Sequence, residues 1–301
     1  MKVLVTGATG FTGPTVCATL LAHGFQVVAA LRPGRAAPPG TDPKFIADIG
    51  PETDWSNALL GVDAVVHLAA RAHIMDETAA DPAGLYTRIN RDGCLNLATQ
   101  AEGRRFIFIS SIKVNGEVTD TDRPYTAFDT PNPVDPYGIS KLEAEQGLKQ
   151  RPTLPWTILR PTLIHGPGVK GNLARIKNLL KRRIPIPLGA VRNQRSLIGL
   201  NNLADAICFC LSHDQTIGNT FMLRDDENIS VPDLFRRIGH TQGTPALLLP
   251  VPVSVLRLAG RLTGKQATIH RLTGSLTVDD RPLRDLGWKQ PLTLDQGLAL
   301  L

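Results

Sequence analysis

Short runs of apolar residues alternate with segments of helical periodicity through the first half of the chain. The runs have the length of strands and predict six of them, at residues 3–5, 25–31, 44–47, 64–68, 105–109 and 156–159. The patterns between them predict helices at residues 12–22, at residues 82–101 and from about residue 135. Strands that alternate with helices form right-handed crossovers in a parallel sheet, and strands that are apolar throughout fit a sheet covered on both faces. The pattern therefore predicts an α/β fold with a doubly wound parallel sheet.

The pattern becomes less regular after residue 160, where prolines and glycines cluster. Helical segments are predicted there at residues 172–183, 201–212, 231–239 and 252–262. We expect residues 1–165 to form the sheet domain, with residues 190–223 returning to it. Residues 166–301 would form mainly a smaller C-terminal α/β substrate lobe.

Composition and charge exclude several classes of protein. The chain has 301 residues, of which 42% are hydrophobic and 20% charged, so it is neither disordered nor fibrous. Its formal net charge is +6, but the densest basic cluster, at residues 177–183, is short. A nucleic-acid partner is therefore not expected. The positive surplus instead suits small anionic ligands such as phosphates.

The cysteines and the apolar stretches indicate the cellular compartment in which the protein is expected. Cys17, Cys94, Cys208 and Cys210 form no metal-binding or redox pair motif, so we expect free buried thiols and no metal site. The longest apolar stretch, residues 246–255, contains two prolines and is shorter than a membrane span. No charged and apolar leader precedes the first strand. These features predict a cytoplasmic protein with no membrane insertion.

Three glycines spaced three apart join the first strand to the first helix. Gly7 permits a tight turn, Gly10 allows the backbone to approach a pyrophosphate, and Gly13 allows the helix to pack close to the strand. Backbone amides at the helix N-terminus then bind the anion. Because the loop lies inside a βαβ unit, it predicts a dinucleotide site that also includes Thr9 and Phe11.

The segment after the second strand bears on which dinucleotide binds. An acid commonly holds the adenosine ribose hydroxyls about 20 residues past the glycines. Here Arg32 stands at the end of the strand and no Asp or Glu occurs before Asp42. Arg32, with Arg35 nearby, can accept a 2′-phosphate bidentately. The sequence therefore favours NADP(H), and NAD(H) stays open.

Tyr137 and Lys141 form a Tyr-x-x-x-Lys pair on one face of a predicted helix. A nearby ammonium favours the phenolate, so we expect the pKa of Tyr137 to fall below its usual value of about 10. The tyrosine would then exchange a proton with a substrate hydroxyl or ketone. Ser111, after the fifth strand, is the candidate to bind the reacting oxygen, with Ser110 as the alternative. The other two tyrosines, Tyr86 and Tyr125, have no comparable sequence setting.

These motifs resemble the extended branch of the short-chain dehydrogenase/reductase superfamily, the NAD-dependent epimerase/dehydratase family. The resemblance covers essentially the whole chain and implies a Rossmann-type sheet, a catalytic set of Ser111, Tyr137 and Lys141, and a homodimer formed by the helix near 82–101 and the helix that carries the Tyr-x-x-x-Lys pair. It also implies that Tyr137 and Lys141 contact the cofactor. Further cofactor-binding positions that it implies are Asp48, Ile49, Leu68, Ala69, Ala70 and Asn90. We expect His67 to be structural.

The second half carries segments similar to those that bind a nucleotide sugar in this family. Residues 160–168 resemble its Arg-Pro…Tyr-Gly-Pro-Gly segment, with His165 in place of the tyrosine. The resemblance implies a UDP-sugar substrate. It places the contacts to that substrate at Ser111, Lys113, Asn172, Arg195 and Arg271.

The family contains several reactions, and one is excluded by the residues after Ser111. Its 4,6-dehydratases have Asp-Glu there, whereas this chain has Ile112 and Lys113, and a lysine cannot replace that acid. The segment 110–117 is similar to bacterial surface-polysaccharide enzymes that reduce UDP-4-keto-6-deoxy-N-acetylhexosamine to UDP-N-acetylquinovosamine. We therefore expect a 4-ketoreductase. A UDP-hexose 4-epimerase, acting on glucose or N-acetylglucosamine, and a non-catalytic dinucleotide-binding sensor stay open as alternatives.

Overall fold

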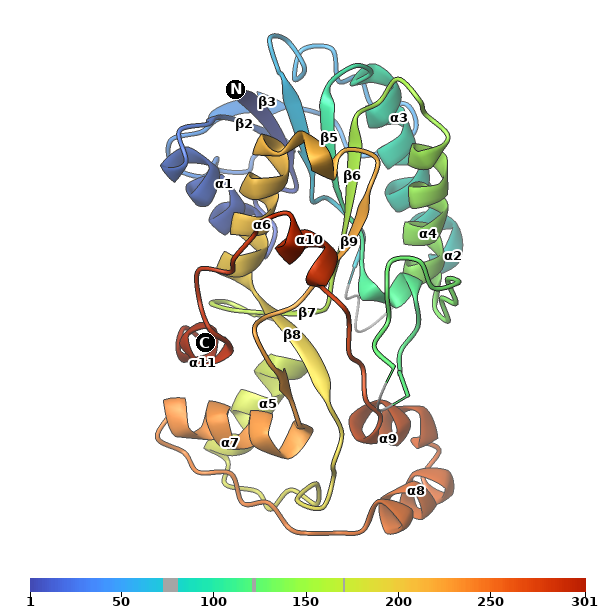
Figure 1. Ribbon diagram of the computed structural model, residues 1–301, viewed down its shortest axis with the longest axis vertical. Coiled ribbons are helices and arrows are strands. Elements are labelled where there is room, and N and C mark those ends of the chain that lie inside the picture. The colour runs from blue at the N-terminus through green and yellow to red at the C-terminus, as the bar shows by residue number, and fades with distance from the viewer. Residues whose placement is uncertain (73–80, 121–122, 170) are drawn as a thin grey trace.

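A seven-stranded parallel sheet with helices on both faces forms the larger part of the molecule (Figure 1). The structure is a computed structural model that describes residues 1–72, 81–120, 123–169 and 171–301. The strand order is β3-β2-β1-β4-β5-β6-β9, and every neighbouring pair is parallel. The strands are β1 Lys2–Thr6, β2 Gln26–Leu31, β3 Asp42–Phe45, β4 Ala64–His67, β5 Arg105–Ile109, β6 Trp156–Pro161 and β9 Thr220–Leu223. The order reverses beside β1, as in a Rossmann-type sheet, so the predicted fold class is confirmed.

Alternate residues of the strands face different helix layers. Val3 and Val5 pack in one apolar core with α1 and α6, whereas Leu4 packs in a second core with α3 and α4. The four helices are α1 Gly13–Ala22, α3 Gly93–Gln100, α4 Pro136–Lys149 and α6 Leu200–Ser212. Because both faces are covered, all three side chains are fully buried, which explains why the strands are apolar throughout.

Two predicted elements have different bounds in the structure. The third strand spans Asp42–Phe45 rather than 44–47, because an edge strand that pairs on one side only tolerates polar residues and a proline. The predicted helix 82–101 is interrupted: α2 Pro82–Tyr86 and α3 flank a π-helical turn, Thr87–Asp92. At the start of α3, a Cβ on Gly93 would lie 2.7 Å from Ile49 Cγ2, so the chain packs closely there.

A smaller lobe continues from one end of the sheet. It contains a three-stranded sheet in the order β10-β8-β7 and a separate apolar core. Its strands are β7 Leu163–His165, β8 Arg195–Gly199 and β10 Asn228–Ile229. The remaining helices are α5 Asn172–Lys181, α7 Val231–Thr241, α8 Val253–Leu262, α9 Gln266–Thr273, α10 Arg281–Asp285 and α11 Leu294–Ala299. The segment 190–223 contributes β8 to the small sheet and α6 and β9 to the large one, and the division into two domains stays a prediction.

Three further expectations concern thiols, metals and membranes. Cys17, Cys94, Cys208 and Cys210 are buried and free. Among the described residues, no group of three or more His, Cys, Asp or Glu is placed to hold a metal ion. In the same described segments, every helix is too short or too polar to cross a bilayer.

Candidate functional site

The glycine loop lies against the end of β4. Gly7 has a φ of +70°, and a Cβ there would lie 2.9 Å from the backbone nitrogen of Ala69. A Cβ on Gly13 would lie 2.3 Å from the carbonyl oxygen of Gly7. Only glycine therefore permits both approaches. The loop and the segment 68–70, which were predicted to hold one cofactor, are in direct contact.

The N-terminus of α1 has the properties of a pyrophosphate site. Thr9 and Gly10 are exposed at the tip of the loop, and Gly10 N donates to Gly7 O at 2.9 Å, which closes the turn. The N-cap residue Thr12 makes no side-chain capping hydrogen bond, so the first amides of the ten-residue helix are not capped by it. The positive end of the helix dipole then favours an anion. This cradle fits the diphosphate of a dinucleotide.

Arg32 and Asp48 meet at the ends of β2 and β3. Arg32 Nη1 lies 3.9 Å from Asp48 Oδ1, and both side chains are mostly exposed. Asp48 also accepts a hydrogen bond from Ile49 N at 3.0 Å. The backbone N–H of Arg35 donates a hydrogen bond to the carbonyl oxygen of Arg32, which closes a turn. A cation that attracts a 2′-phosphate thus lies beside a carboxylate that repels one.

Ser111 and Tyr137 are brought together between the end of β5 and the start of α4. Burial raises the pKa of Tyr137 to about 12, and a side-chain hydrogen bond with Ser111 acts in the opposite direction. Tyr86 packs edge-on against Tyr137, with ring centroids 6.3 Å apart and planes at 68°. Tyr86 therefore has a place at the site that its sequence setting did not reveal.

Lys141 lies one turn further along α4 and is almost fully buried. Its Nζ donates to Ile109 O at 2.6 Å and lies 4.3 Å from the centre of the Phe108 ring. Burial lowers the pKa of Lys141 to about 8. The expected lowering of the Tyr137 pKa is wrong for this structure, because desolvation of the phenol dominates and the Lys141 ammonium bonds to the end of β5.

A buried ion pair lies directly behind these residues. Glu145, one turn beyond Lys141, accepts from Arg160 Nε at 2.9 Å and from Arg160 Nη2 at 2.5 Å. Ser110 Oγ donates to the same carboxylate at 2.5 Å, and Arg160 Nη1 donates to Asn115 Oδ1 at 2.9 Å. All four side chains are at most 2% exposed. Ser110 is thereby directed into the interior, whereas Ser111 faces Tyr137.

Asn90 is also held by protein contacts. It is fully buried in the π-helical turn. Its Nδ2 donates to Ser140 Oγ at 2.9 Å, and its Oδ1 accepts from Arg71 N at 2.8 Å. These bonds connect the turn to the middle of α4. The position links the two helices, and direct contact with a cofactor stays a prediction.

The three predicted substrate-binding cations, Lys113, Arg195 and Arg271, lie near Glu117. Lys113 Nζ and Arg271 Nη1 lie 3.3 and 3.5 Å from Glu117 Oε1. Arg195 donates to the carbonyl oxygens of Arg271 and Gly274 at 3.1 and 3.3 Å, and burial lowers its pKa. Lys113 also pairs with Asp135, the N-cap residue of α4. The side chain of Asn172, the first residue of α5, lies outside the described part of the structure.

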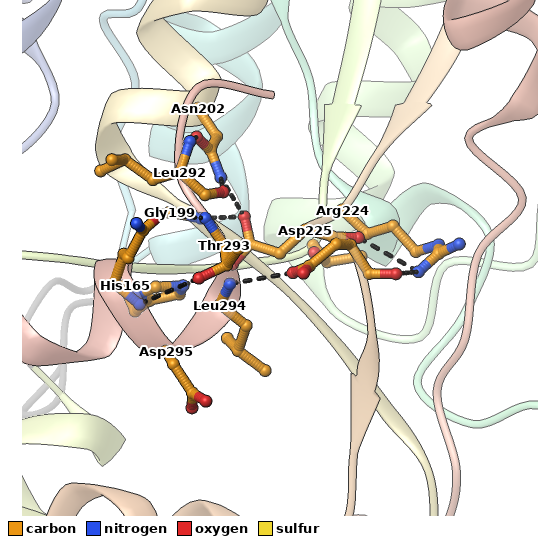
Figure 2. A network of polar contacts seen from close by, with 12 residues as sticks. His165, Gly199, Asn202, Arg224, Asp225, Leu292, Thr293, Leu294 and Asp295 are labelled. Atoms are coloured by element: carbon orange, nitrogen blue, oxygen red, sulfur yellow. Dashed lines mark hydrogen bonds and ion pairs between the residues drawn. The ribbon is translucent and has the colours of Figure 1, made fainter. Parts of the chain in front are cut away.

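His165 belongs to a different network, in the lobe (Figure 2). Its Nε2 and Asp225 Oδ2 are 2.6 Å apart, and both side chains are fully buried. Asp225 Oδ1 accepts from Gly199 N at 2.8 Å and from Asn202 Nδ2 at 2.7 Å. A Cβ on Gly297 would lie 2.6 Å from the His165 ring, so α11 packs directly on it. His165 therefore connects the small sheet to the C-terminal helix.

His67 is buried at the end of β4. Its Nδ1 lies 2.8 Å from Thr6 Oγ1, and burial lowers its pKa to about 3. A neutral ring that joins two neighbouring strands has a structural role, in line with the prediction.

Comparison with known proteins identifies relatives along the whole chain. The profile of the NAD dependent epimerase/dehydratase family matches residues 3–223. A UDP-glucose 4-epimerase of Vibrio cholerae is 40% identical, over 98% of this chain and 93% of its own. A GDP-6-deoxy-D-mannose reductase of Pseudomonas aeruginosa is 27% identical, over 100% of this chain and 95% of its own length. The structure of Thermus thermophilus UDP-glucose 4-epimerase with NAD has a TM-score of 0.76 and is 21% identical in sequence. The match covers 100% of this chain and 97% of that chain, and it supports the fold.

The buried ion pair generates a prediction about stability. Glu145→Gln keeps the shape of the side chain but leaves the Arg160 charge buried without a partner. We expect the free energy of unfolding to fall by about 3–5 kcal/mol. Urea denaturation followed by circular dichroism measures it. The matched control is Glu143→Gln, on the same helix. The carboxylate of Glu143 is partly exposed and lies 3.3 Å from Arg91, so this substitution should lower the free energy of unfolding by less than about 1 kcal/mol. Equal losses in the two variants would contradict the prediction.

The depressed pKa of Lys141 predicts a pH dependence of stability. The folded protein releases this proton near pH 8, whereas the unfolded chain keeps it up to about pH 10.5. Between these values the unfolded chain binds more protons, so the contribution of Lys141 to stability rises with pH. Urea denaturation of the wild type and of Lys141→Met, at steps between about pH 7 and pH 10, isolates it. The difference in unfolding free energy, wild type minus variant, should increase with pH, and a constant difference would refute the assignment.

Proposed function

The chain belongs to the NAD dependent epimerase/dehydratase family, and from that premise we propose that it reduces the 4-keto group of a UDP-4-keto-6-deoxy-N-acetylhexosamine. Membership makes the cofactor a nicotinamide dinucleotide, and the relatives support chemistry at carbon 4 of a nucleotide sugar. The choice of reduction over epimerisation rests on the position of Arg32 at the end of β2. An exposed arginine where NAD-binding sheets commonly place an acid favours NADP(H), which supplies electrons for net reduction.

The chain's own residues have distinct tasks in this proposal. The loop from Gly7 to Gly13 holds the dinucleotide diphosphate at the start of α1. The reduced nicotinamide, when bound, supplies a hydride to the carbonyl carbon. Tyr137 provides the proton that the carbonyl oxygen takes up, and Ser111 donates a hydrogen bond to the same oxygen. The ketone would thereby become a hydroxyl.

Lys141 prepares the tyrosine for this role. A phenol with a pKa near 12 is a weak proton donor at neutral pH, and a cation close by stabilises the phenolate that remains. The Lys141 ammonium is one helical turn from Tyr137 and is now bonded to Ile109 O. We propose that it turns from this carbonyl towards the cofactor ribose and the phenolate during turnover.

The cluster around Glu117 is the proposed site for the substrate diphosphate. The cluster combines three cations, Lys113, Arg195 and Arg271, with two carboxylates, Glu117 and Asp135, so it keeps a net positive charge. A diphosphate is the ligand that complements such a surplus. Lys113, which pairs with Glu117 and Asp135, stands where a dehydratase has the acid that follows its catalytic Ser or Thr.

The second candidate function is a UDP-hexose 4-epimerase, favoured by the 40% identity to the Vibrio cholerae relative. An epimerase uses the same three side chains, but it oxidises and re-reduces carbon 4 and retains its NAD. We further propose a cytoplasmic homodimer that pairs along α3 and α4, where Ile139 is 43% exposed.

One assay separates these functions. With UDP-4-keto-6-deoxy-N-acetylglucosamine, we expect stoichiometric oxidation of NADPH or NADH, and no interconversion of UDP-glucose with UDP-galactose. Tyr137→Phe should lower turnover by at least about a hundredfold without loss of cofactor binding. Redox-neutral turnover of UDP-glucose or UDP-N-acetylglucosamine, with no oxidation of added cofactor, would establish the epimerase instead. Indifference of every measurable activity to Tyr137→Phe would indicate the sensor.

The ion pair of Arg32 with Asp48 predicts opposite effects on cofactor choice. Arg32→Gln removes the cation for the 2′-phosphate and should raise the KM for NADPH about tenfold, with little change for NADH. Asp48→Asn removes the competing carboxylate and should lower the KM for NADPH. Steady-state kinetics with both cofactors measures the ratio. A change that is the same for NADPH and NADH would contradict a role for Arg32 in binding the 2′-phosphate.

A further inference from the structure

Helix α8 has an apolar stripe on the side that faces away from the lobe core. Leu256 and Gly260 form its buried side and are packed towards α9. Val255, Leu258 and Leu262 are exposed by 52%, 57% and 80%. Their spacing of three and four residues places them in one row along the helix. A solvent-facing row of this kind is unusual, because the exposed face of a surface helix is normally polar.

More exposed apolar side chains lie in the segments that lead to α8. Leu247 and Leu249 are each 49% exposed, and their strand-like segment is hydrogen-bonded to Ile186 on both sides. Ile184, two residues earlier, is 43% exposed. In Figure 1, α7, the connection after it and α8 form the lower end of the lobe. This end therefore combines several exposed aliphatic residues on backbone that is fixed by hydrogen bonds.

The connection after α7 and the helices α8 and α9 contain cations and no carboxylates. From Leu234 to Val278 the sequence contains no Asp or Glu but six Lys and Arg, of which Arg236, Arg237 and Arg271 pair with carboxylates outside that range. Arg257 and Arg261, one turn apart on α8, flank the apolar stripe, and Lys265 follows. In the described structure, none of these three side chains is paired with a carboxylate. Residues 166–301 contain 18 Lys and Arg against 10 Asp and Glu, whereas residues 1–165 contain 15 against 17.

We propose that this end of the lobe docks on an anionic lipid bilayer, with α8 lying in the plane of the interface. Exposed leucines enter the boundary between headgroups and acyl chains, and flanking arginines contact the headgroup phosphates. The helix lies on the membrane and does not span it, in agreement with its length of ten residues. The inference does not rest on the proposed enzymatic reaction.

Two other occupants fit the surface less well. A second copy that docks through the same face would bring two positive surfaces together in an isologous interface, which is unfavourable. A nucleic acid would neutralise the arginines but would leave Leu258 and Leu262 without an apolar partner. An anionic bilayer satisfies both the charge and the apolar stripe.

Vesicle sedimentation with the full chain tests the proposal. At low ionic strength we expect binding to vesicles of equal parts phosphatidylcholine and phosphatidylglycerol, little binding to pure phosphatidylcholine, and release by salt. The double variants Leu258→Ser with Leu262→Ser, and Arg257→Gln with Arg261→Gln, should each weaken binding about tenfold or more. The matched control is Leu60→Ser, a residue 74% exposed in the other half of the molecule, which should bind as the wild type does.

Several outcomes would overturn the proposal. They are the absence of binding to the anionic vesicles, binding that survives both double variants, and equal binding to neutral vesicles. Self-association that disappears with Leu258→Ser and Leu262→Ser, without lipid binding, would assign the stripe to a second copy. Thermal denaturation of each variant and its binding of cofactor show whether a loss of binding reflects unfolding, because α8 lies outside the predicted cofactor site.

Discussion

The arrangement of the candidate site depends on the buried ion pair between Glu145 and Arg160. Removing two charges from water is costly, and here the cost is offset by a bidentate contact and by hydrogen bonds with Ser110 and Asn115. These partners come from α4, β6, the end of β5 and the turn after it. The pair therefore connects the segments that carry Ser111, Tyr137 and Lys141, although Glu145 and Arg160 are themselves buried.

The two halves of the molecule use charge in different ways. Beneath the site, each buried charge has a specific partner, and burial shifts the pKa values of Lys141 and Tyr137 away from their usual values. In the lobe, cations outnumber carboxylates and many stay near the surface. That surplus includes Arg195 and Arg271, which lie near Glu117, and the basic flank of α8. A candidate site held by a buried ion pair is thus joined to a lobe with a surplus of positive charge.

Much of the sheet and the glycine loop could be predicted from the sequence, because strands buried on both faces and residues such as Gly7 and Gly13 obey local rules. The strands β7, β8, β9 and β10 were not predicted, since short strands have too little periodicity to detect. The Glu145–Arg160 pair joins residues from different elements, so local pattern does not show it, although Glu145 continues the face that carries Tyr137 and Lys141. The raised pKa of Tyr137 depends on burial, which spacing does not reveal.

The proposed reduction would take a hydride from bound reduced nicotinamide at carbon 4 of a nucleotide sugar and a proton from Tyr137 at the carbonyl oxygen, with Ser111 and Lys141 assisting. Transfer of deuterium from nicotinamide-labelled NADPH or NADH to UDP-4-keto-6-deoxy-N-acetylglucosamine tests it most directly. We expect a product that carries one deuterium at carbon 4, formed by the wild type and not by Tyr137→Phe. A product without deuterium at carbon 4, or equal labelling by the variant, would contradict it.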